Sequence, residues 1–230
     1  MTLANTLTLD YQREAFAAGK VLRLVNWHNT PQSQRAVLKA ELSWYLDHYH
    51  PLLPEDLDRF IETGQWQLDK PGFIPVFYDS YLNNATVAAP VCDELGLTAW
   101  FFPITGILDV APEDQAAYAE EHHFTILPEE RQQDRVAMNW DDLAVIGRRH
   151  VIAAHTAHHA SAADIVTAED VEREITTPIR QIEELTGVKP PAFAFLYGTP
   201  PDADTAAGAA VMGSGVRYAT TNTSYLRIAD

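Results

Sequence analysis

The chain has 230 residues, of which 47% are hydrophobic, and it carries a formal net charge of −16 at pH 7. The hydrophobic fraction is enough for a folded core and excludes an intrinsically disordered chain, and the length suits one large α/β domain. The acidic surface repels phosphate backbones, so nucleic acid and anionic membranes are not expected partners.

Short apolar runs alternate along the chain with amphipathic stretches. Several runs are rich in Val, Ile or aromatic residues, which favours β-strands. The predicted strands are 21–27, 74–78, 98–102, 150–153, 192–196 and 216–220. The predicted helices between them are 31–48, 84–96, 139–147, 168–187 and 202–213. This alternation predicts a parallel sheet, either open or closed into a barrel.

Single residues mark several helix ends. Asn139 is a plausible N-cap, and Gly96 and Gly187 are typical residues at helix C-termini. Pro178 is expected to kink its helix. Residues 1–19 precede the first predicted strand and are interpreted as an N-terminal extension of a single domain that spans residues 1–230.

Polar residues follow several of the predicted strands directly. His28 follows the first strand, Asp79 the second, and Tyr197 the fifth, while His155 and His159 follow the fourth. In parallel α/β folds, reactive groups gather at the carboxyl ends of the strands. We therefore expect these side chains to lie along one rim of the sheet.

His155 and His159 form an H-x-x-x-H pair, and on a helix or helical turn this spacing places both imidazoles on one face. Asp79 is a candidate third ligand, because two histidines and one carboxylate leave coordination positions open for water and substrate. Zinc is the first expectation, and cobalt, nickel or iron accept the same ligands. His158 is an alternative ligand to His159 if the turn is irregular. The pair His122–His123 lies in an acidic stretch and is expected on the surface.

Three segments resemble the motifs of one family. The segment VFYDSYLNN (76–84) resembles T-F-D-D-G-Y-x-D-N, HTAHH (155–159) resembles H-[ST]-x-x-H, and FAFLYGTP (193–200) resembles F-x-Y-P-Y-G. These are motifs of the polysaccharide deacetylases, the NodB-homology domain of carbohydrate esterase family four. Further similar segments at 95–103, 138–143 and 216–221 occur in the family's order, so the resemblance covers roughly residues 70–225.

The resemblance implies a distorted (β/α) barrel that binds one divalent metal through Asp79, His155 and His159. It also implies removal of N-acetyl groups from a carbohydrate, in which the metal polarises the amide carbonyl and activates a water molecule. An acid then protonates the leaving amine, and a backbone N–H, here that of Tyr197, holds the oxyanion.

The first strand resembles that of the poly-N-acetylglucosamine deacetylases, a circularly permuted branch in which a histidine at this strand end is the general acid. His28, which follows Trp27, is therefore the candidate acid, and the alternative is a buried structural histidine. Trp27 and Asn84 are candidate substrate contacts; the alternatives are a core role for Trp27 and a turn-shaping role for Asn84.

The first motif departs from the family at the position of the catalytic base. Tyr78 occupies the position of an aspartate, and its ordinary pKa of ~10 makes it a poor base at neutral pH. Some members also carry an arginine in the third motif, where this chain has Phe195 or its neighbours.

Three interpretations follow. The first is an active deacetylase with altered base chemistry, which the retained metal ligands favour. The second is a weak or inactive protein that binds metal and a carbohydrate ligand. The third is a metal-dependent amidohydrolase for a small, non-polymeric amide.

Cys92 is the only cysteine, so an intrachain disulfide and a cysteine-based zinc site are excluded. The N-terminal residues do not show the pattern of a secretory signal, and no stretch approaches the ~18 apolar residues of a membrane span. A cytoplasmic location is the resulting expectation. The sequence predicts no oligomeric state.

Overall fold

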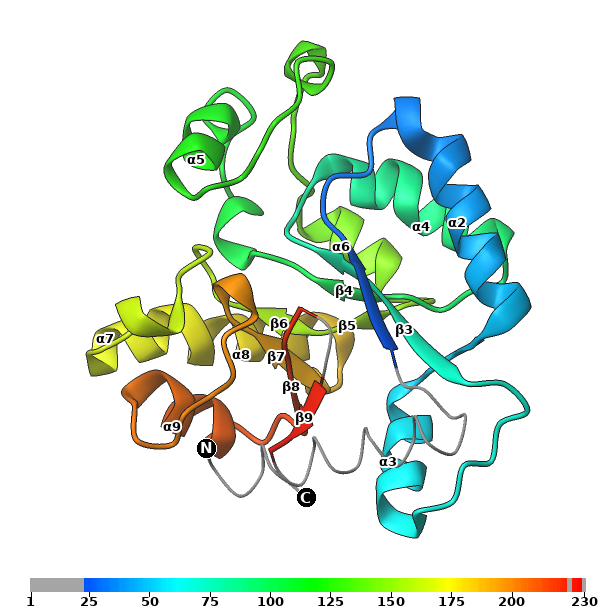
Figure 1. Cartoon of the computed structure of the whole chain (residues 1–230). Coiled ribbons are helices and arrows are strands. Elements are labelled where there is room, and N and C mark those ends of the chain that lie inside the picture. The colour runs from blue at the N-terminus through cyan, green and yellow to red at the C-terminus, as the bar shows by residue number, and fades with distance from the viewer. Residues whose placement is uncertain (1–22, 223–224, 229–230) are drawn as a thin grey trace.

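Parallel strands form the centre of the molecule, and helices lie around them (Figure 1). The computed structural model describes residues 23–222 and 225–228. The strands are β1 (Arg23–Trp27), β2 (His50–Pro51), β3 (Gly72–Tyr78), β4 (Trp100–Phe102), β5 (Val151–Ile152), β6 (Ala154–His155), β7 (Ala192–Ala194), β8 (Tyr218–Thr220) and β9 (Tyr225–Arg227). The α-helices are α2 (Arg35–His48), α3 (Pro54–Thr63), α4 (Ala89–Glu94), α5 (Gln115–Glu121), α6 (Trp140–Ile146), α7 (Ala168–Val171), α8 (Thr177–Thr186) and α9 (Ala206–Gly213).

The strands form two sheets, and the chain passes directly from the last strand of the first sheet to the first strand of the second. The first sheet has the order β1-β3-β4-β5, with β2 paired to the start of β3, and the second has the order β6-β7-β8-β9. All of these pairs are parallel except β8–β9. Ala153 alone separates β5 from β6, and its N–H donates to the carbonyl of Phe101 at 2.8 Å. The parallel α/β architecture predicted from the sequence is confirmed.

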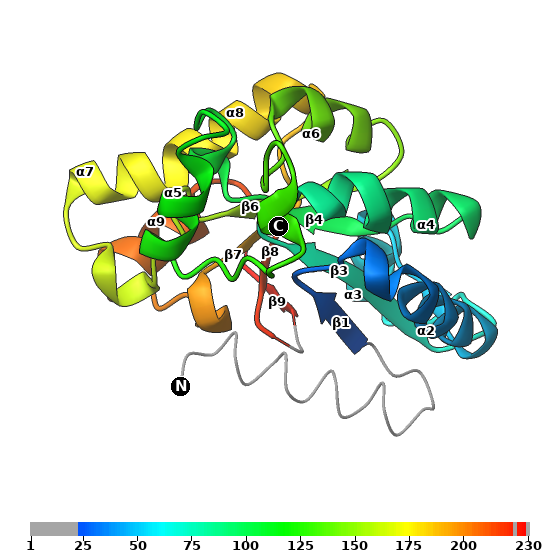
Figure 2. The ribbon, with the colours of Figure 1, turned by 90° about the horizontal axis from the view of Figure 1, so that it is seen from above.

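The ladders of the described strands end at β1 and β9, and these ladders do not close a barrel. The two ends nevertheless lie close together, as the view from above shows (Figure 2). Asn26 on β1 donates through its side-chain amide to the carbonyl of Asn222, just after β8, at 2.7 Å. A side chain thus bridges the opening that backbone pairing leaves between the first and last strands.

The central strand β3 is buried on both faces, as expected for a parallel strand covered from both sides. Phe73 and Phe77 pack into the core between the strands and the helices α2, α4, α6, α8 and α9. Ile74, Val76 and Tyr78 point to the opposite face, into a second core that α3 covers. Because the side chains alternate along the strand, Tyr78 is the last residue of β3 that points into this second core.

The six predicted strands are all present, with ends within two residues of the expected ones. Asn139 caps α6 by accepting from the N–H of Asp142, and Gly187 ends α8 with φ of 76°. The irregularity expected near Pro178 is a π-helical turn at Glu172–Thr176, directly before α8. Proline has no N–H to donate, so the regular ladder of helix hydrogen bonds is interrupted there.

The pattern did not indicate α3, α5, β2 or β9. The two strands have two or three residues each, too few to show a period. The predicted N-terminal extension, residues 1–19, lies outside the described residues. Within the described parts of the chain, no helix has both the length and the apolar character needed to cross a membrane.

Candidate metal centre

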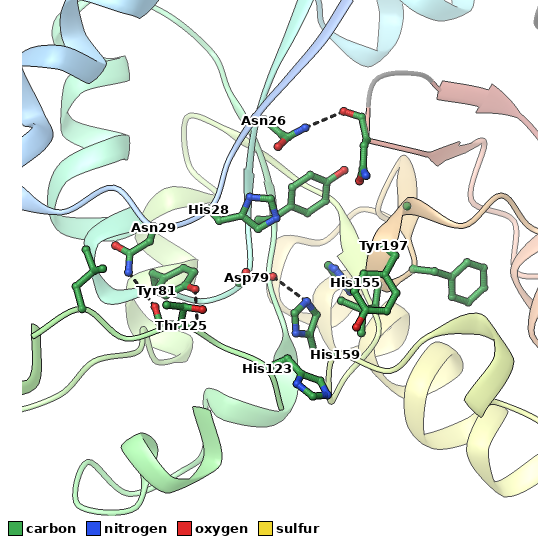
Figure 3. Close-up of a pocket in the computed structure, with 16 residues that line it drawn as sticks. Asn26, His28, Asn29, Asp79, Tyr81, His123, Thr125, His155, His159 and Tyr197 are labelled. Carbon is green, nitrogen blue, oxygen red and sulfur yellow. Dashed lines mark hydrogen bonds and ion pairs between the residues drawn. The ribbon is translucent and has the colours of Figure 1, made fainter. Parts of the chain in front are cut away.

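Three buried side chains from distant parts of the sequence meet at the strand ends (Figure 3). Asp79 follows β3, His155 ends β6, and His159 lies in the turn that comes after β6. One potential ligand atom from each residue lies within 4.8 Å of the other two. Asp79 and His155 are 3% exposed and His159 is 8% exposed. The structure therefore brings these three side chains together at one rim, as expected from the sequence.

The histidine pair does not lie on a helix. His155 belongs to a strand, and the chain then makes a turn in which His159 has φ of 58°. This differs from the helical turn expected from the spacing. The imidazoles converge because the chain reverses direction after β6, not because they share one face of a helix.

Two hydrogen-bond acceptors face each other at this centre. Oδ1 of Asp79 is buried, finds no hydrogen-bond donor among the described residues, and lies 3.5 Å from Nε2 of His159. Nδ1 of His159 lies 2.7 Å from the carbonyl oxygen of His122. A carbonyl can only accept, so Nδ1 carries the proton and Nε2 presents a lone pair towards Asp79.

Burial also disfavours charge on all three groups. It raises the pKa of Asp79 to about 7 and lowers the pKa of His159. The pKa of His155 falls well below its ordinary value, mainly through burial and also through the neighbouring His159. A cation between these groups would supply the positive charge that the carboxylate and the lone pair lack.

Nδ1 of His155 has two contacts that require opposite protonation states. The N–H of Thr156 lies 2.8 Å away and needs an acceptor, and the Thr156 hydroxyl oxygen lies 3.1 Å away. That hydroxyl donates to the carbonyl of Ala160, so it can accept from Nδ1. When Nδ1 carries the proton and donates to this hydroxyl, Nε2 of His155 has a free lone pair and can bind a cation. Two imidazoles and one carboxylate then form a donor set that fits a divalent transition metal.

A chain of hydrogen bonds anchors the turn that carries His159. Glu174 is 2% exposed, and it accepts from both the backbone N–H and the Nδ1 of His158 at 2.9 Å. The carbonyl of His158 accepts from Nδ1 of His122 at 2.9 Å, and the carbonyl of His122 accepts from His159. Of the two candidate histidines, the structure therefore brings His159 to the centre and holds His158 against Glu174.

The three side chains lie in the wall of a cavity of about 510 Å³ (Figure 3). His28, Tyr78 and Tyr197 also line this cavity. The ring of His28 stacks on Tyr78 with centroids 5.3 Å apart, and desolvation by its surroundings lowers the pKa of His28 although part of the residue faces solvent. Tyr197 is 71% exposed.

A family model described as polysaccharide deacetylase matches residues 75–216, more than half of the chain. The chain belongs to the polysaccharide deacetylase family. The matched range contains Asp79, His155 and His159, and His28 lies before it.

Several solved structures share the fold of this family member. The deacetylase PplD of Streptococcus pyogenes, in complex with acetate, is 14% identical with a TM-score of 0.60, covering 82% of this chain and 79% of that chain. IcaB of Ammonifex degensii is 15% identical with a TM-score of 0.60, covering 83% and 78%. A de-N-acetylase of Aggregatibacter actinomycetemcomitans is 17% identical with a TM-score of 0.63, covering 86% of each chain. No curated protein sequence matches the chain.

The cavity of this deacetylase-family chain contains Tyr78, at the position where the motif resemblance predicts the base. Burial raises the pKa of Tyr78 to about 12, and its hydroxyl lies 3.3 Å from that of Thr220. Tyr78 therefore keeps its proton at neutral pH. Among the described residues that line the cavity, Asp79 is the only carboxylate.

Two predicted substrate contacts are not among the residues that line the cavity. Trp27 stacks on Phe77 at 5.4 Å and donates to Glu41, on the face of β1 opposite to Asn26. Successive strand residues point to opposite faces, so Trp27 points away from the cavity that Asn26 lines. Asn84 is buried and donates to the carbonyl of Tyr78 at 2.8 Å, which supports the turn before Asp79.

The sequence analysis did not predict five polar residues of the cavity wall, which are Asn26, Asn29, His123, Thr125 and Asn222. Asn26 lies two residues before His28 on β1, so strand alternation could have found it. His122 and His123 were expected on the surface. His122 is instead half-buried and holds His159, and His123 is exposed at the cavity, for which its loop sequence carries no signal.

Proposed function

We propose that this chain is a metal-dependent hydrolase that removes N-acetyl groups from a carbohydrate. The observation that carries the proposal is the buried group of Asp79, His155 and His159, in which a carboxylate oxygen with no donor among the described residues faces an imidazole lone pair. Membership of the polysaccharide deacetylase family supports a carbohydrate substrate. Two of the similar structures are described as a deacetylase and a de-N-acetylase.

Asp79, His155 and His159 would hold one divalent cation, with zinc the best match to two imidazoles and one carboxylate and with cobalt, nickel or iron as alternatives. When bound, such an ion polarises a carbonyl group and lowers the pKa of bound water. The remaining residues of the cavity must then position the ligand and move protons.

His28 is the proposed proton-transfer group. Its ring lies against Tyr78, beside the position of the family's base, and its lowered pKa leaves it neutral at pH 7. A neutral imidazole accepts a proton from water at a ring nitrogen and can return it to the leaving amine nitrogen. One histidine would thus perform both transfers, because Tyr78 holds its proton and Asp79 serves as a ligand.

Tyr197 would stabilise the developing oxyanion through its backbone N–H. Its φ of 64° turns the chain sharply at the end of the third motif, and the residue lines the cavity. An N–H fixed before the reaction stabilises charge without reorganisation. Asn26, Asn29 and Asn222 add amide groups to the wall, and such groups suit the hydroxyl and acetamido groups of a sugar.

A second candidate function is a weak or inactive deacetylase-fold protein that binds metal and a carbohydrate. The observation that favours it is Tyr78 at the base position, with its pKa raised to about 12. The two functions share the metal centre and differ only in turnover.

The test is acetate release from N-acetylglucosamine oligomers by the purified chain with zinc. The proposal predicts release that is lost with a chelator and in the Asp79→Ala and His155→Ala variants. Release that persists in the chelated protein contradicts it. Zinc and oligomer binding without release supports the second candidate.

A further inference from the structure

Four non-glycine residues in the described parts of the chain have left-handed backbone conformations, and all four line the same cavity. They are Asp79, His123, His159 and Tyr197, with φ between 58° and 64°. This conformation forces the Cβ towards a carbonyl oxygen, so non-glycine residues there are strained. Strain of this kind gathers at functional sites. Asp79, His159 and Tyr197 have roles in the proposed function, and His123 has none.

The end of α4 provides a comparison for His123 within the same protein. After α4, Gly96 has φ of 64° and the next N–H, of Leu97, bonds back to the carbonyl of Cys92. After α5, His123 has φ of 59° and the N–H of Phe124 bonds back to Ala119 in the same pattern. Glycine is the usual residue at this position of a helix end. The turn after α5 therefore needs the left-handed conformation but not the imidazole.

The surroundings of the His123 imidazole leave it available to a ligand. Figure 3 shows the ring near His159, at the edge of the metal centre. His123 is exposed, and its ring makes no hydrogen bond with another described residue. The other histidine of the pair, His122, instead uses both its ring and its carbonyl to hold the turn that carries His159.

We propose that His123 contacts the substrate, with its imidazole hydrogen-bonded to a hydroxyl or acetamido oxygen of an N-acetylated sugar bound at the metal centre. The ligand class rests on the proposed function. The contact explains why a strained histidine occupies a position that glycine fills after α4. An imidazole ring can donate and accept hydrogen bonds, which suits a ligand whose polar groups do both.

The test compares His123→Gly with His123→Ala in the full chain. Both variants remove the imidazole, and only glycine relieves the left-handed strain. Alanine in the left-handed conformation is strained and glycine is not. In a chain of this size, such a difference in stability should raise the melting temperature of the glycine variant above that of the alanine variant by about 2–4 °C. Isothermal calorimetry of the zinc-loaded proteins with an N-acetylglucosamine tetramer should show affinity reduced about 3–10-fold in both, the value of one hydrogen bond.

Two further variants separate a contact from a general effect. His123→Asn, which tolerates the left-handed conformation and keeps a donor and an acceptor, should recover part of the affinity. His48→Ala removes an imidazole on α2 that hydrogen-bonds Trp44, and it should leave binding unchanged. Zinc affinity should remain within about twofold of wild type in every variant.

Unchanged tetramer affinity in both the glycine and alanine variants would overturn the proposal. A parallel loss of zinc affinity would also overturn it, because His123 would then act through His159. Equal melting temperatures for the two variants would show that this position is not strained, which would also contradict the proposal. Tetramer binding without acetate release contradicts the proposed function alone, whereas acetate release with no His123 effect on binding or KM contradicts this inference alone.

Discussion

Replacement of Asp79 by asparagine is expected to stabilise the metal-free protein above neutral pH and to remove most of its stabilisation by zinc. Asp79 is 3% exposed, and its Oδ1 finds no donor among the described residues. Asparagine has nearly the same shape, is uncharged, and tolerates the left-handed φ of 64° at this position. The substitution therefore changes the charge with little change in shape.

The size and sign of the effect follow from the pKa of Asp79. Burial raises it from 3.8 to about 7, so the folded chain holds this proton more tightly than the unfolded chain does. The stability of the metal-free protein should therefore fall as pH rises between these values, and the loss is complete above pH 7. About three pH units at about 1.4 kcal/mol each correspond to about 4 kcal/mol. Below pH 4 both states are protonated, and the variant and the wild type should be equally stable.

The assay is urea denaturation of chelator-treated protein from pH 4 to pH 9, followed by the same series with zinc. At 100 times its dissociation constant, zinc should stabilise the wild type by about 2.7 kcal/mol and the variant far less. Asp69→Asn is the matched control, because it makes the same substitution at a side chain that is 82% exposed. A metal-free Asp79→Asn protein that gains no stability at pH 8, or gains it equally at pH 4, refutes the buried-charge reasoning. Equal zinc stabilisation of variant and wild type refutes the assignment of Asp79 as a ligand.

Other substitutions test the remaining residues of the cavity. Tyr78→Phe should keep acetate release within about twofold, because the Tyr78 hydroxyl holds its proton with a pKa of about 12; a tenfold loss would show that the hydroxyl takes part. His28→Ala should lower acetate release about 100-fold at unchanged zinc affinity, the usual size of an acid–base contribution, and a fall in zinc affinity would make His28 a ligand instead. Glu174→Gln should weaken zinc binding about tenfold in a competition assay with a chelator, because Glu174 anchors the turn that carries His159. The exposed Glu172→Gln is its control, and equal zinc affinities in the two variants would contradict the anchoring role.

The local pattern of the sequence was enough to predict the sheet and the rim. Alternating apolar runs and amphipathic stretches located the strands within two residues, because strand and helix periods are properties of short segments. Asp79, His155 and His159 were found for the same reason, since each follows a strand closely. Parallel strands bring their carboxyl ends to one edge.

Local sequence patterns do not show which of two neighbouring side chains faces the site. The structure turns His159 towards Asp79 and holds His158 on Glu174, a contact between residues 16 positions apart. It also turns Trp27 away from the cavity, because Asn26, the preceding residue of β1, faces it. The spacing of residues does not reveal which of two adjacent histidines a distant carboxylate will bind.

The sequence by itself determined the parallel α/β fold and the three residues that meet at the strand ends, because both follow from local periodicity and strand direction. Only the tertiary structure decided the surroundings of that meeting point. It buried Tyr78 beneath His28, left Oδ1 of Asp79 with no donor in the described part of the chain, and brought His123 from the end of α5 to the cavity wall. Burial depends on how distant segments pack, and the left-handed turns at the non-glycine residues of the cavity carry no glycine that would mark them in the sequence.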